Sequence, residues 1–464
     1  MKTAAFHTLG CKVNTYETEV MRQALIRDGW EIRSFEEEAD VYVINTCSVT
    51  NIADRKSRQM LHRAKKRNPD SVVVAAGCYA QAAADVLKDD ESVDVIIGNH
   101  EKKDIAEILR EFLSLRDAAR ESGAGAESGA GAETERNAGA MPVFERVGDI
   151  GCVRSYSEAP AGTISDHTRA FLKVQDGCNQ FCSYCIIPYV RGRVRSRAAE
   201  DVRREAERFA AQGLKELVLT GIHISSYGKD LPEDEPVRDL VRLTELLDGV
   251  EGISRVRLGS LEPRIITPEA VERLGALKSF CPHFHLSLQS GSESVLKRMN
   301  RHYTPEEYLE GVREIRRVFP DAAITTDIIT GFPGETEKEF DETVAFVEEV
   351  RFYETHIFPY SVRKGTRAAA MPGQLANAVK EERAGVLAEI DRAAKRLFRE
   401  RRIGRTEEIL TEEREEIGGT VYMTGNTREY VRIAVPDAER NTLVRGRVTG
   451  FLTPDVLIME KADT

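Results

Sequence analysis

The hydrophobic pattern of the first hundred residues alternates between short β-branched runs and longer amphipathic stretches. The apolar runs of strand length are 4–9, 41–45, 72–76 and 93–97. Alternation at this spacing is typical of right-handed βαβ units and a mostly parallel sheet. We therefore expect an N-terminal parallel α/β domain over residues 1–115.

A second series of strand and helix patterns begins at about residue 168. Its strand candidates are 171–175, 216–221, 256–260, 283–289, 323–330 and 355–360. Six such units are too few for an eight-fold barrel, so the pattern predicts an open, partial (β/α)6 barrel. We place this central domain at residues 164–396, with a long helix at its end.

The two remaining segments differ in pattern. Residues 399–463 hold five short alternating strands, which predict a small antiparallel β-barrel of OB-like character. Residues 116–160 lack periodicity and contain ESGAGA twice in succession, at 121–126 and 127–132. Such a composition buries little apolar surface, so we expect a flexible linker.

Composition narrows the class of protein. The 464 residues carry a net charge of −11, so an argument for nucleic-acid binding must rest on local basic clusters. There is no run of about 18 apolar residues, and the N-terminus lacks the apolar region of a signal peptide. We expect a cytoplasmic protein with no membrane partner. Eight cysteines are too few for a disulfide scaffold, so their spacing points to metal ligation or catalysis.

Three cysteines form a C-x3-C-x2-C run directly after the first strand of the barrel series. They are Cys178, Cys182 and Cys185. Three thiolates on one short loop can hold three irons of a [4Fe–4S] cluster and leave the fourth iron open for a ligand. The alternative is a zinc loop, which needs a fourth ligand and usually has C-x2-C pairs. The spacing favours the cluster.

Three further cysteines each follow a predicted strand of the N-terminal domain. They are Cys11, Cys47 and Cys78. The carboxyl ends of parallel strands share one edge of a sheet, so these thiols are expected to converge there. The alternative is three unrelated buried thiols. We expect a second three-cysteine [4Fe–4S] cluster, and we expect Cys152 and Cys281 to be ordinary thiols.

The C-x3-C-x2-C run after the first strand of a partial barrel resembles the radical S-adenosylmethionine (SAM) superfamily. The resemblance implies that SAM chelates the open iron and that its reductive cleavage gives a 5′-deoxyadenosyl radical. It also implies SAM-holding roles for Gly221, Glu262 and Gln289. Gly221 could equally be a plain strand-to-loop glycine. The nine histidines show no metal-ligand spacing, and we expect core or surface roles for them.

Two such clusters on separate α/β domains resemble the methylthiotransferase branch of this superfamily. The motifs that carry the likeness include LGCKVN at 9–14, NTCSVT at 45–50, TGIHISSYG at 220–228 and DIITGFPGET at 327–336. The resemblance implies a C-terminal TRAM module that binds RNA. It further implies methylthiolation with two SAM molecules per product and an electron donor such as a flavodoxin or ferredoxin.

Three substrate groups compete within this branch. The motif wording is most similar to enzymes that modify carbon 2 of N6-threonylcarbamoyladenosine in the anticodon loop of tRNA. The alternatives are isopentenyladenosine in tRNA and an aspartate of a ribosomal protein. A rival of a different class is a non-enzymatic iron–sulfur or zinc protein that binds RNA. DNA is not an expected partner.

Three local basic clusters are candidate RNA contacts. Residues 55–67 hold seven Lys or Arg and no acid, and residues 392–405 hold seven with one acid. Arg191, Arg193, Arg195 and Arg197 alternate, so an extended chain would place all four on one side. Such clusters suit phosphate contacts, although any one alone could be a solvated face.

Overall fold

The computed structural model describes residues 2–121, 142–156 and 168–462. By internal contacts the chain divides into two compact units. The first comprises Met1–Thr163 with two short later segments, Gly177–Asn179 and Cys185–Arg193. The second comprises Ile164–Asp176, Gln180–Tyr184 and Val194–Thr464. Among the described residues, none of the helices combines the length and apolarity that a membrane crossing requires.

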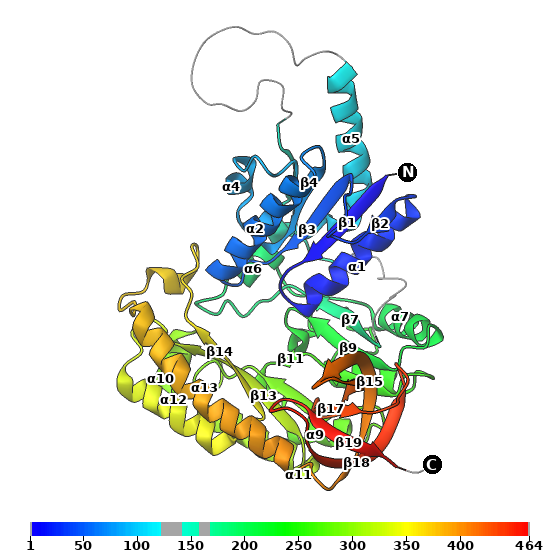
Figure 1. Cartoon of the computed structure of the whole chain (residues 1–464). Helices are drawn as coiled ribbons and strands as arrows, with labels where there is room; N and C mark the ends of the chain where they lie inside the picture. Colours follow the sequence, from blue (N-terminus) through cyan, green and yellow to red (C-terminus); the bar gives the residue numbers. More distant parts are fainter. Residues whose placement is uncertain (1, 122–141, 157–167, 463–464) are drawn as a thin grey trace. The chain divides into compact units, whose positions relative to one another are not determined.

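A six-stranded parallel sheet forms the centre of the first unit (Figure 1). Its strands, in spatial order, are β2 (Glu31–Arg33), β1 (Thr3–Thr8), β3 (Val41–Thr46), β4 (Val72–Gly77), β5 (Val95–Ile97) and β6 (Phe144–Arg146). Its helices are α1 (Lys12–Arg27), α2 (Asn51–Arg67), α3 (Cys78–Ala82), α4 (Ala84–Lys88), α5 (Ile105–Glu121) and α6 (Ile187–Arg191), with short 3-10 turns at Glu101–Asp104 and Ile150–Cys152.

Helices cover both faces of this sheet because its central strands, β3 and β4, are buried at every position. Val41, Val43 and Val74 pack toward α1 and α5, whereas Tyr42 and Ile44 pack toward α2 and α4. Alternate side chains of a strand point to opposite faces, and burial on both faces requires continuous apolar runs. The predicted parallel α/β fold is confirmed.

The predicted linker at 116–160 needs correction. Helix α5 continues to Glu121, and Phe144–Arg146 forms β6, which pairs with β5 in parallel. A three-residue strand at a sheet edge is too short to show a period of two in the sequence. Apart from its first residue, Glu121, the ESGAGA repeat lies outside the described residues.

The second unit begins with a partial barrel of parallel strands in two sheets. One sheet has the order β10-β9-β7-β8 and the other β11-β12-β13-β14. The strands are β7 (Arg169–Asp176), β8 (Arg195–Ser196), β9 (Glu216–Gly221), β10 (Arg255–Leu258), β11 (Ser260–Leu261), β12 (His283–Leu286), β13 (Ala323–Thr330) and β14 (Glu354–Pro359). Only the short β8 runs antiparallel within these two sheets. The candidate strand at 256–260 divides at Gly259 into β10 and β11.

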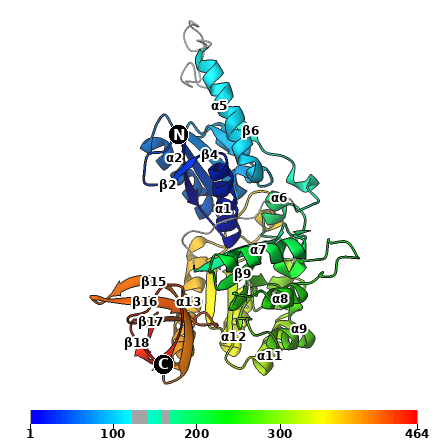
Figure 2. The same ribbon diagram turned by 90° about the vertical axis from the view of Figure 1, so that its right-hand side faces the viewer.

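Helices cover the outer side of these strands, as Figure 2 shows for α7, α8, α9 and α11. Their bounds are α7 (Ala199–Ala211), α8 (Leu240–Asp248), α9 (Pro268–Gly275), α10 (Glu293–Arg298), α11 (Pro305–Val318), α12 (Glu337–Val350) and α13 (Asn377–Glu400), with 3-10 turns at Ile224–Ser226, Pro263–Ile265 and Arg367–Ala370. Helices α11 and α12 both begin with a capping box, Thr304 with Glu307 and Thr336 with Glu339. The inner side of the strands is thus left for function.

A closed five-stranded barrel ends the second unit. It consists of β15 (Thr406–Ile417), β16 (Thr420–Asn426), β17 (Arg432–Val435), β18 (Leu443–Phe451) and β19 (Leu457–Lys461). The prediction of a small barrel is confirmed, but one pair, β17 with β19, is parallel. The pairing partner of a strand is set by tertiary closure, which its own pattern does not record.

Buried arginines join this barrel to the partial barrel. Arg257 donates to the carbonyl of Arg428 (2.8 Å) and pairs with Glu216 (2.9 Å), and Arg255 donates to the carbonyl of Asn426 (2.7 Å). The ring of Tyr430 lies 4.8 Å from the guanidinium of Arg257 and 5.2 Å from that of Arg169. These bonds to main-chain carbonyls hold the small barrel in a defined position on the unit.

Candidate metal centres and cofactor site

The first three predicted ligands follow three neighbouring strands of the first unit. Cys11 precedes α1 after β1, Cys47 directly follows β3, and Cys78 directly follows β4. The loops of the first two are in contact, because a Cβ on Gly10 would lie 2.8 Å from the Cys47 sulfur. Gly10 has φ +98°, so both its backbone conformation and the space around it require glycine.

Asn14 and Arg191 connect all three cysteine loops. The side chain of Asn14 donates to the carbonyls of Leu9 (2.7 Å) and Thr46 (2.9 Å), which come shortly before Cys11 and Cys47. Arg191 in turn donates to the Asn14 side chain (2.7 Å) and, through Nε, to the Cys78 sulfur (3.2 Å). Both residues are buried. The three thiols therefore belong to one hydrogen-bonded edge of the sheet.

A buried charge network holds Arg191 in place. Its guanidinium forms a two-pronged ion pair with Glu17, which also pairs with Lys102. Glu17 and Lys102 are 1% and 2% exposed. Burial lowers the pKa of Lys102, although the Glu17 carboxylate acts in the opposite direction. Helix α6, which carries Arg191, packs against α3 and so fixes the Arg191 contact with Cys78.

The donor set fits an iron–sulfur cluster. Thiolates are the soft ligands that such clusters require, and hydrogen bonds to their sulfurs are a common feature of these sites. The Cys78 sulfur faces N–H groups of Arg191 and Asn99, the second at 3.7 Å. Burial, together with the neighbouring Cys78 and Cys11, raises the pKa of Cys47 to about 11. A metal would have to displace that proton to bind.

The other three cysteines lie on the loop between β7 and α6, and all three are half-buried. The N–H of Cys178 donates to the carbonyl of Gly192 (3.0 Å), and a Cβ on Gly177 would overlap the Arg193 carbonyl. Glycine is therefore required where the loop begins. The Cys182 sulfur accepts a hydrogen bond from Nη1 of half-buried Arg301 (3.3 Å). Arg301 was not predicted, because nothing in its local pattern marks it.

The three candidate SAM residues differ in what surrounds them. Gln289 is buried at φ +72°, a strained conformation for a residue with a side chain, and such strain is concentrated at functional sites. Glu262 is 9% exposed, and its carboxylate pairs with Arg264 (3.0 Å). A Cβ on Gly221 would meet the Gln175 carbonyl at 2.8 Å, so close packing alone accounts for that glycine.

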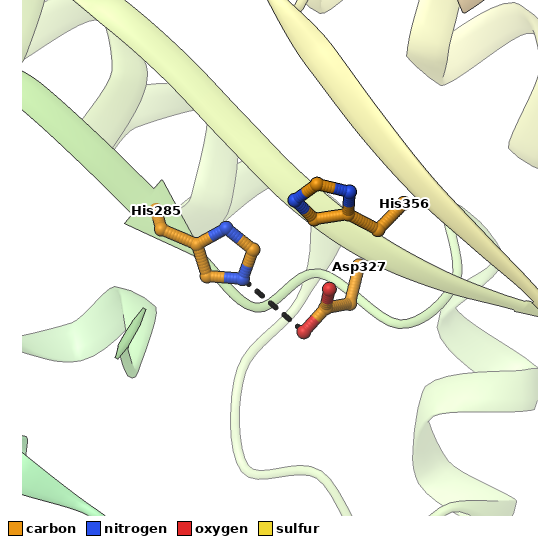
Figure 3. Close-up of side chains that lie close together, drawn as sticks. All are labelled: His285, Asp327 and His356. Carbon is orange, nitrogen blue, oxygen red and sulfur yellow. Dashed lines mark hydrogen bonds and ion pairs between the residues drawn. The ribbon is translucent and has the colours of Figure 1, made fainter. Parts of the chain in front are cut away.

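Three residues of adjacent strands form a cluster that spacing did not predict. His285 on β12, Asp327 on β13 and His356 on β14 have ligand-type atoms within 4.8 Å of one another (Figure 3). Nε2 of His285 lies 3.2 Å from Asp327, and the two imidazoles are stacked with centroids 5.6 Å apart. Residues about 40 and 30 positions apart in the chain meet only through the sheet register, so no local signal could reveal them.

His223, which follows β9, is a further polar residue of interest. Its Nδ1 lies 2.7 Å from the Ser226 hydroxyl, whereas its buried Nε2 has no hydrogen-bond partner among the described residues. Burial, followed by the charge of Arg301, lowers the pKa of His223 to about 4. His223 is therefore neutral at physiological pH and has one ring nitrogen available for a ligand.

Most of the predicted RNA-binding arginines have other roles. Three of the four alternating arginines are buried in ion pairs, Arg191 with Glu17, Arg195 with Asp176 and Arg197 with Glu205, so the four-arginine phosphate stripe is wrong. In the cluster at 392–405 every basic residue except Arg401 pairs with an acid of the described chain. In the cluster at 55–67, Arg55, Lys56 and Lys66 are exposed and form no ion pair with a described residue.

Comparison with known proteins agrees with this arrangement. Residues 172–347 match the Radical SAM superfamily, and residues 3–98 match a family described as Uncharacterized protein family UPF0004. Threonylcarbamoyladenosine tRNA methylthiotransferase MtaB of Bacillus subtilis strain 168 is 44% identical over 383 residues, which cover 82% of this chain and 79% of that protein. This chain belongs to the radical SAM methylthiotransferase family.

Other relatives of this family carry a second name. A tRNA-2-methylthio-N(6)-dimethylallyladenosine synthase of Pelotomaculum thermopropionicum is 35% identical, over 91% of this chain and 89% of that protein. Among solved structures, the radical SAM methyltransferase TsrM of Kitasatospora setae has a TM-score of 0.54 at 18% identity, over 80% of this chain and 77% of that one. That likeness bears on the fold alone.

Membership of the family implies a [4Fe–4S] cluster and SAM as cofactors. Cys178, Cys182 and Cys185 are the three thiols predicted to hold this cluster, and their number fits what it requires. Together, the two cofactors supply the abstraction of a hydrogen atom from a C–H bond that no side-chain base could deprotonate. Arg301 holds the Cys182 sulfur and also the Ser287 carbonyl (3.3 Å), which joins the cysteine loop to the end of β12.

Proposed function

We propose that this protein is a tRNA methylthiotransferase that adds a methylthio group to carbon 2 of N6-threonylcarbamoyladenosine next to the anticodon. The observation that carries the proposal is the pair of cysteine sets. One is the C-x3-C-x2-C loop after β7, and the other follows the adjacent strands β1, β3 and β4. The 44% identity to MtaB supports the choice of base.

The second cysteine set is proposed to hold an auxiliary [4Fe–4S] cluster at which sulfur is carried and methylated. One SAM would supply the methyl group and a second SAM the radical, so two SAM molecules are used per product. Gly221, Glu262 and Gln289 are proposed to hold SAM, and Arg301 is proposed as a fourth residue of this site. An electron donor such as a flavodoxin or ferredoxin is expected, and a tRNA substrate would place the enzyme in the cytoplasm.

The domain roles follow from this proposal. Residues 1–115 would carry the auxiliary cluster, residues 164–396 the radical chemistry, and residues 399–463 would be the TRAM module that binds RNA. The closed barrel at β15–β19 supports the last assignment, because small barrels of this type frequently bind nucleic acid.

Nucleoside mass spectrometry of tRNA from cells with and without this gene tests the substrate. We expect loss of the 2-methylthio form and accumulation of N6-threonylcarbamoyladenosine. Loss of a 2-methylthio form of isopentenyladenosine instead would transfer the assignment to the second named group of relatives. If tRNA nucleosides are unchanged, the tRNA proposal is wrong, and the ribosomal protein is the next substrate to test.

Two cysteine variants test the division of labour between the clusters. Cys182→Ala should abolish 5′-deoxyadenosine formation from SAM under reducing, anaerobic conditions. Cys47→Ala should keep that cleavage but lose methylthiolation of tRNA. Cysteine-to-alanine change at Cys152, an exposed thiol outside both sets, is the matched control and should affect neither. Wild-type product from Cys47→Ala would rule out the auxiliary cluster.

A further inference from the structure

The cluster of His285, Asp327 and His356 lies on the inner face of the partial barrel. On β12, Phe284 packs against Phe319 on the helix side, with ring centroids 5.6 Å apart. On β13 and β14, Ile324 and Thr355 line a groove together with residues of α12 and α13. Adjacent residues of a strand point to opposite faces, so the three cluster residues project away from the helices.

This cluster is next to the candidate cofactor residues. The N–H of Gln289 donates to the Asp327 carbonyl (2.8 Å), and Arg301, which contacts Cys182, donates to the carbonyl of Ser287, two residues after His285. These bonds place the cluster beside the chain segment that carries Gln289 and that binds Arg301. A base that reacts there would have its substituents within reach of the cluster.

The cluster keeps unused hydrogen-bonding groups. His285 uses both ring nitrogens, on Thr325 (2.9 Å) and Asp327. His356, in contrast, is exposed, and its ring nitrogens bond to none of the residues that the structure describes. Figure 3 shows the two imidazoles beside each other with the carboxyl of Asp327 next to them. The surface thus offers a donor, an acceptor and a ring plane at one place.

We propose that His356, supported by His285 and Asp327, binds the polar substituent at the N6 position of the substrate base. This inference rests on the proposed function and deepens it, because it assigns a residue to substrate choice. A threonylcarbamoyl group carries urea N–H and C=O groups, a hydroxyl and a carboxylate, all of which can exchange hydrogen bonds with imidazole. A dimethylallyl group is a hydrocarbon and has none.

The discrimination comes from desolvation. A hydrocarbon placed over His356 and Asp327 would remove water from polar groups without replacing its hydrogen bonds, which is costly. A site built to hydrogen-bond its substrate rejects an analogue that lacks the group much more strongly than an apolar pocket rejects an extra polar atom. The cluster therefore favours the threonylcarbamoyl substrate over the dimethylallyl one.

Steady-state kinetics with two tRNA substrates tests this role. His356→Phe keeps a planar ring against His285 and removes both nitrogens, and His356→Asn keeps a hydrogen-bonding group of smaller size. For tRNA bearing threonylcarbamoyladenosine, His356→Phe should lower kcat/KM about 10- to 100-fold, mostly through KM, as the loss of one to two hydrogen bonds predicts. His356→Asn should recover part of this loss. For tRNA bearing the dimethylallyl base, kcat/KM of His356→Phe should stay equal or rise.

Two controls separate binding from damage. Cleavage of SAM without tRNA and the visible spectrum of the iron–sulfur protein should be the same in wild type and in both variants. Metal analysis should find the same zinc and iron content in wild type and in His356→Phe. A loss of one metal ion per chain in His356→Phe would show that the three residues bind a metal, and it would overturn the proposal.

The outcomes for the two proposals are distinct. If the wild type fails to methylthiolate either tRNA, the proposed function fails. If the wild type acts on the threonylcarbamoyl tRNA and His356→Phe has the same kcat/KM and the same ratio between the two substrates, the role of His356 is wrong and the proposed function stands.

Discussion

At the scale of single residues, Arg191 connects the loop of Cys78 to residues of α1 that are far from it in the sequence. It lies six residues after Cys185, yet its guanidinium contacts Cys78, Asn14 and Glu17 of the first unit. An N–H donor and a positive charge beside a cluster thiolate stabilise the reduced cluster and so raise its potential. We therefore expect Arg191 to act as a positioning residue of the proposed auxiliary site.

Replacing Arg191 tests this role. In a variant that lacks Cys178, Cys182 and Cys185, only the auxiliary cluster should remain, and its midpoint potential can be followed by EPR. Adding Arg191→Met should make that potential more negative and lower the iron retained per chain. Arg191→Lys keeps the charge but loses the two-pronged donor group, so its midpoint potential should lie between that of the protein with Arg191 and that of Arg191→Met. Equal potentials in all three proteins would contradict the role.

His223 makes a prediction about pH. Its folded pKa of about 4 lies below the ordinary value of 6.5, so the unfolded chain binds more protons between these values. The contribution of His223 to stability is complete above about pH 6.5 and is lost as the pH falls toward 4, by roughly 3 kcal/mol in total. Urea unfolding of the cluster-free protein should become less pH-dependent in His223→Gln across this range. An unchanged dependence would show that His223 is not held neutral.

The sequence predicts where cysteines come together better than it predicts which acid a charged residue pairs with. Cys11, Cys47 and Cys78 could be placed together because the carboxyl ends of parallel strands share an edge, a rule that needs only the strand pattern. Their role as ligands stays a prediction. Arg195 and Arg197 were assigned to phosphate, but they pair with Asp176 and Glu205. A charge pattern does not record which acid faces it in the fold.

At the scale of elements, Glu216 on β9 stabilises the connection to the C-terminal barrel. It lies between Arg257 and Arg255, and all three are 1% exposed. Burial alone would raise the pKa of Glu216, but the guanidinium of Arg257 brings the net pKa below its ordinary value. The carboxylate is therefore charged and compensates the buried arginines.

Glu216→Gln should be strongly destabilising, because it leaves buried guanidinium charge without its partner. We expect a loss of about 3 kcal/mol, measured by chemical unfolding. Glu207→Gln on α7 removes an exposed partner of Arg203 and should cost less than about 1 kcal/mol. Similar losses in the two variants would show that the buried network contributes no more than a surface pair.

Element boundaries were predictable where the apolar pattern is long and failed where it is short. The strands β3 and β4 stand out because burial on both faces requires nearly continuous apolar residues. β6 has three half-buried residues and pairs with a strand that is nearly fifty positions earlier in the chain. The parallel pair β17–β19 likewise depends on how the barrel closes, which local patterns do not contain.

At the scale of the whole molecule, α2 carries basic side chains that could contact RNA because they are not already paired with acids of the described chain. Arg55, Lys56 and Lys66 are the exposed basic residues of that helix that form no ion pair with a described residue. Changing all three to Gln should weaken tRNA binding and reduce the salt dependence of log Kd by about 2. Arg204 and Arg317 are exposed, Arg203 is half-buried, and all three are paired with acids; changing these three to Gln is the control. An equal effect of both triples would remove α2 as the RNA contact.

The position of the segment Cys185–Arg193 constrains how the domains of this chain can recombine during evolution. It is encoded within the part of the sequence that matches the Radical SAM superfamily, but it completes the buried network of Glu17 and Lys102 in the N-terminal domain. A recombination event near residue 160 that exchanged the N-terminal domain with that of a distant relative would pair one lineage's Glu17 with another lineage's arginine. The N-terminal domain and the rest of the chain are therefore expected to diverge together, and a chimera should function only if residues 185–193 are exchanged together with the N-terminal domain.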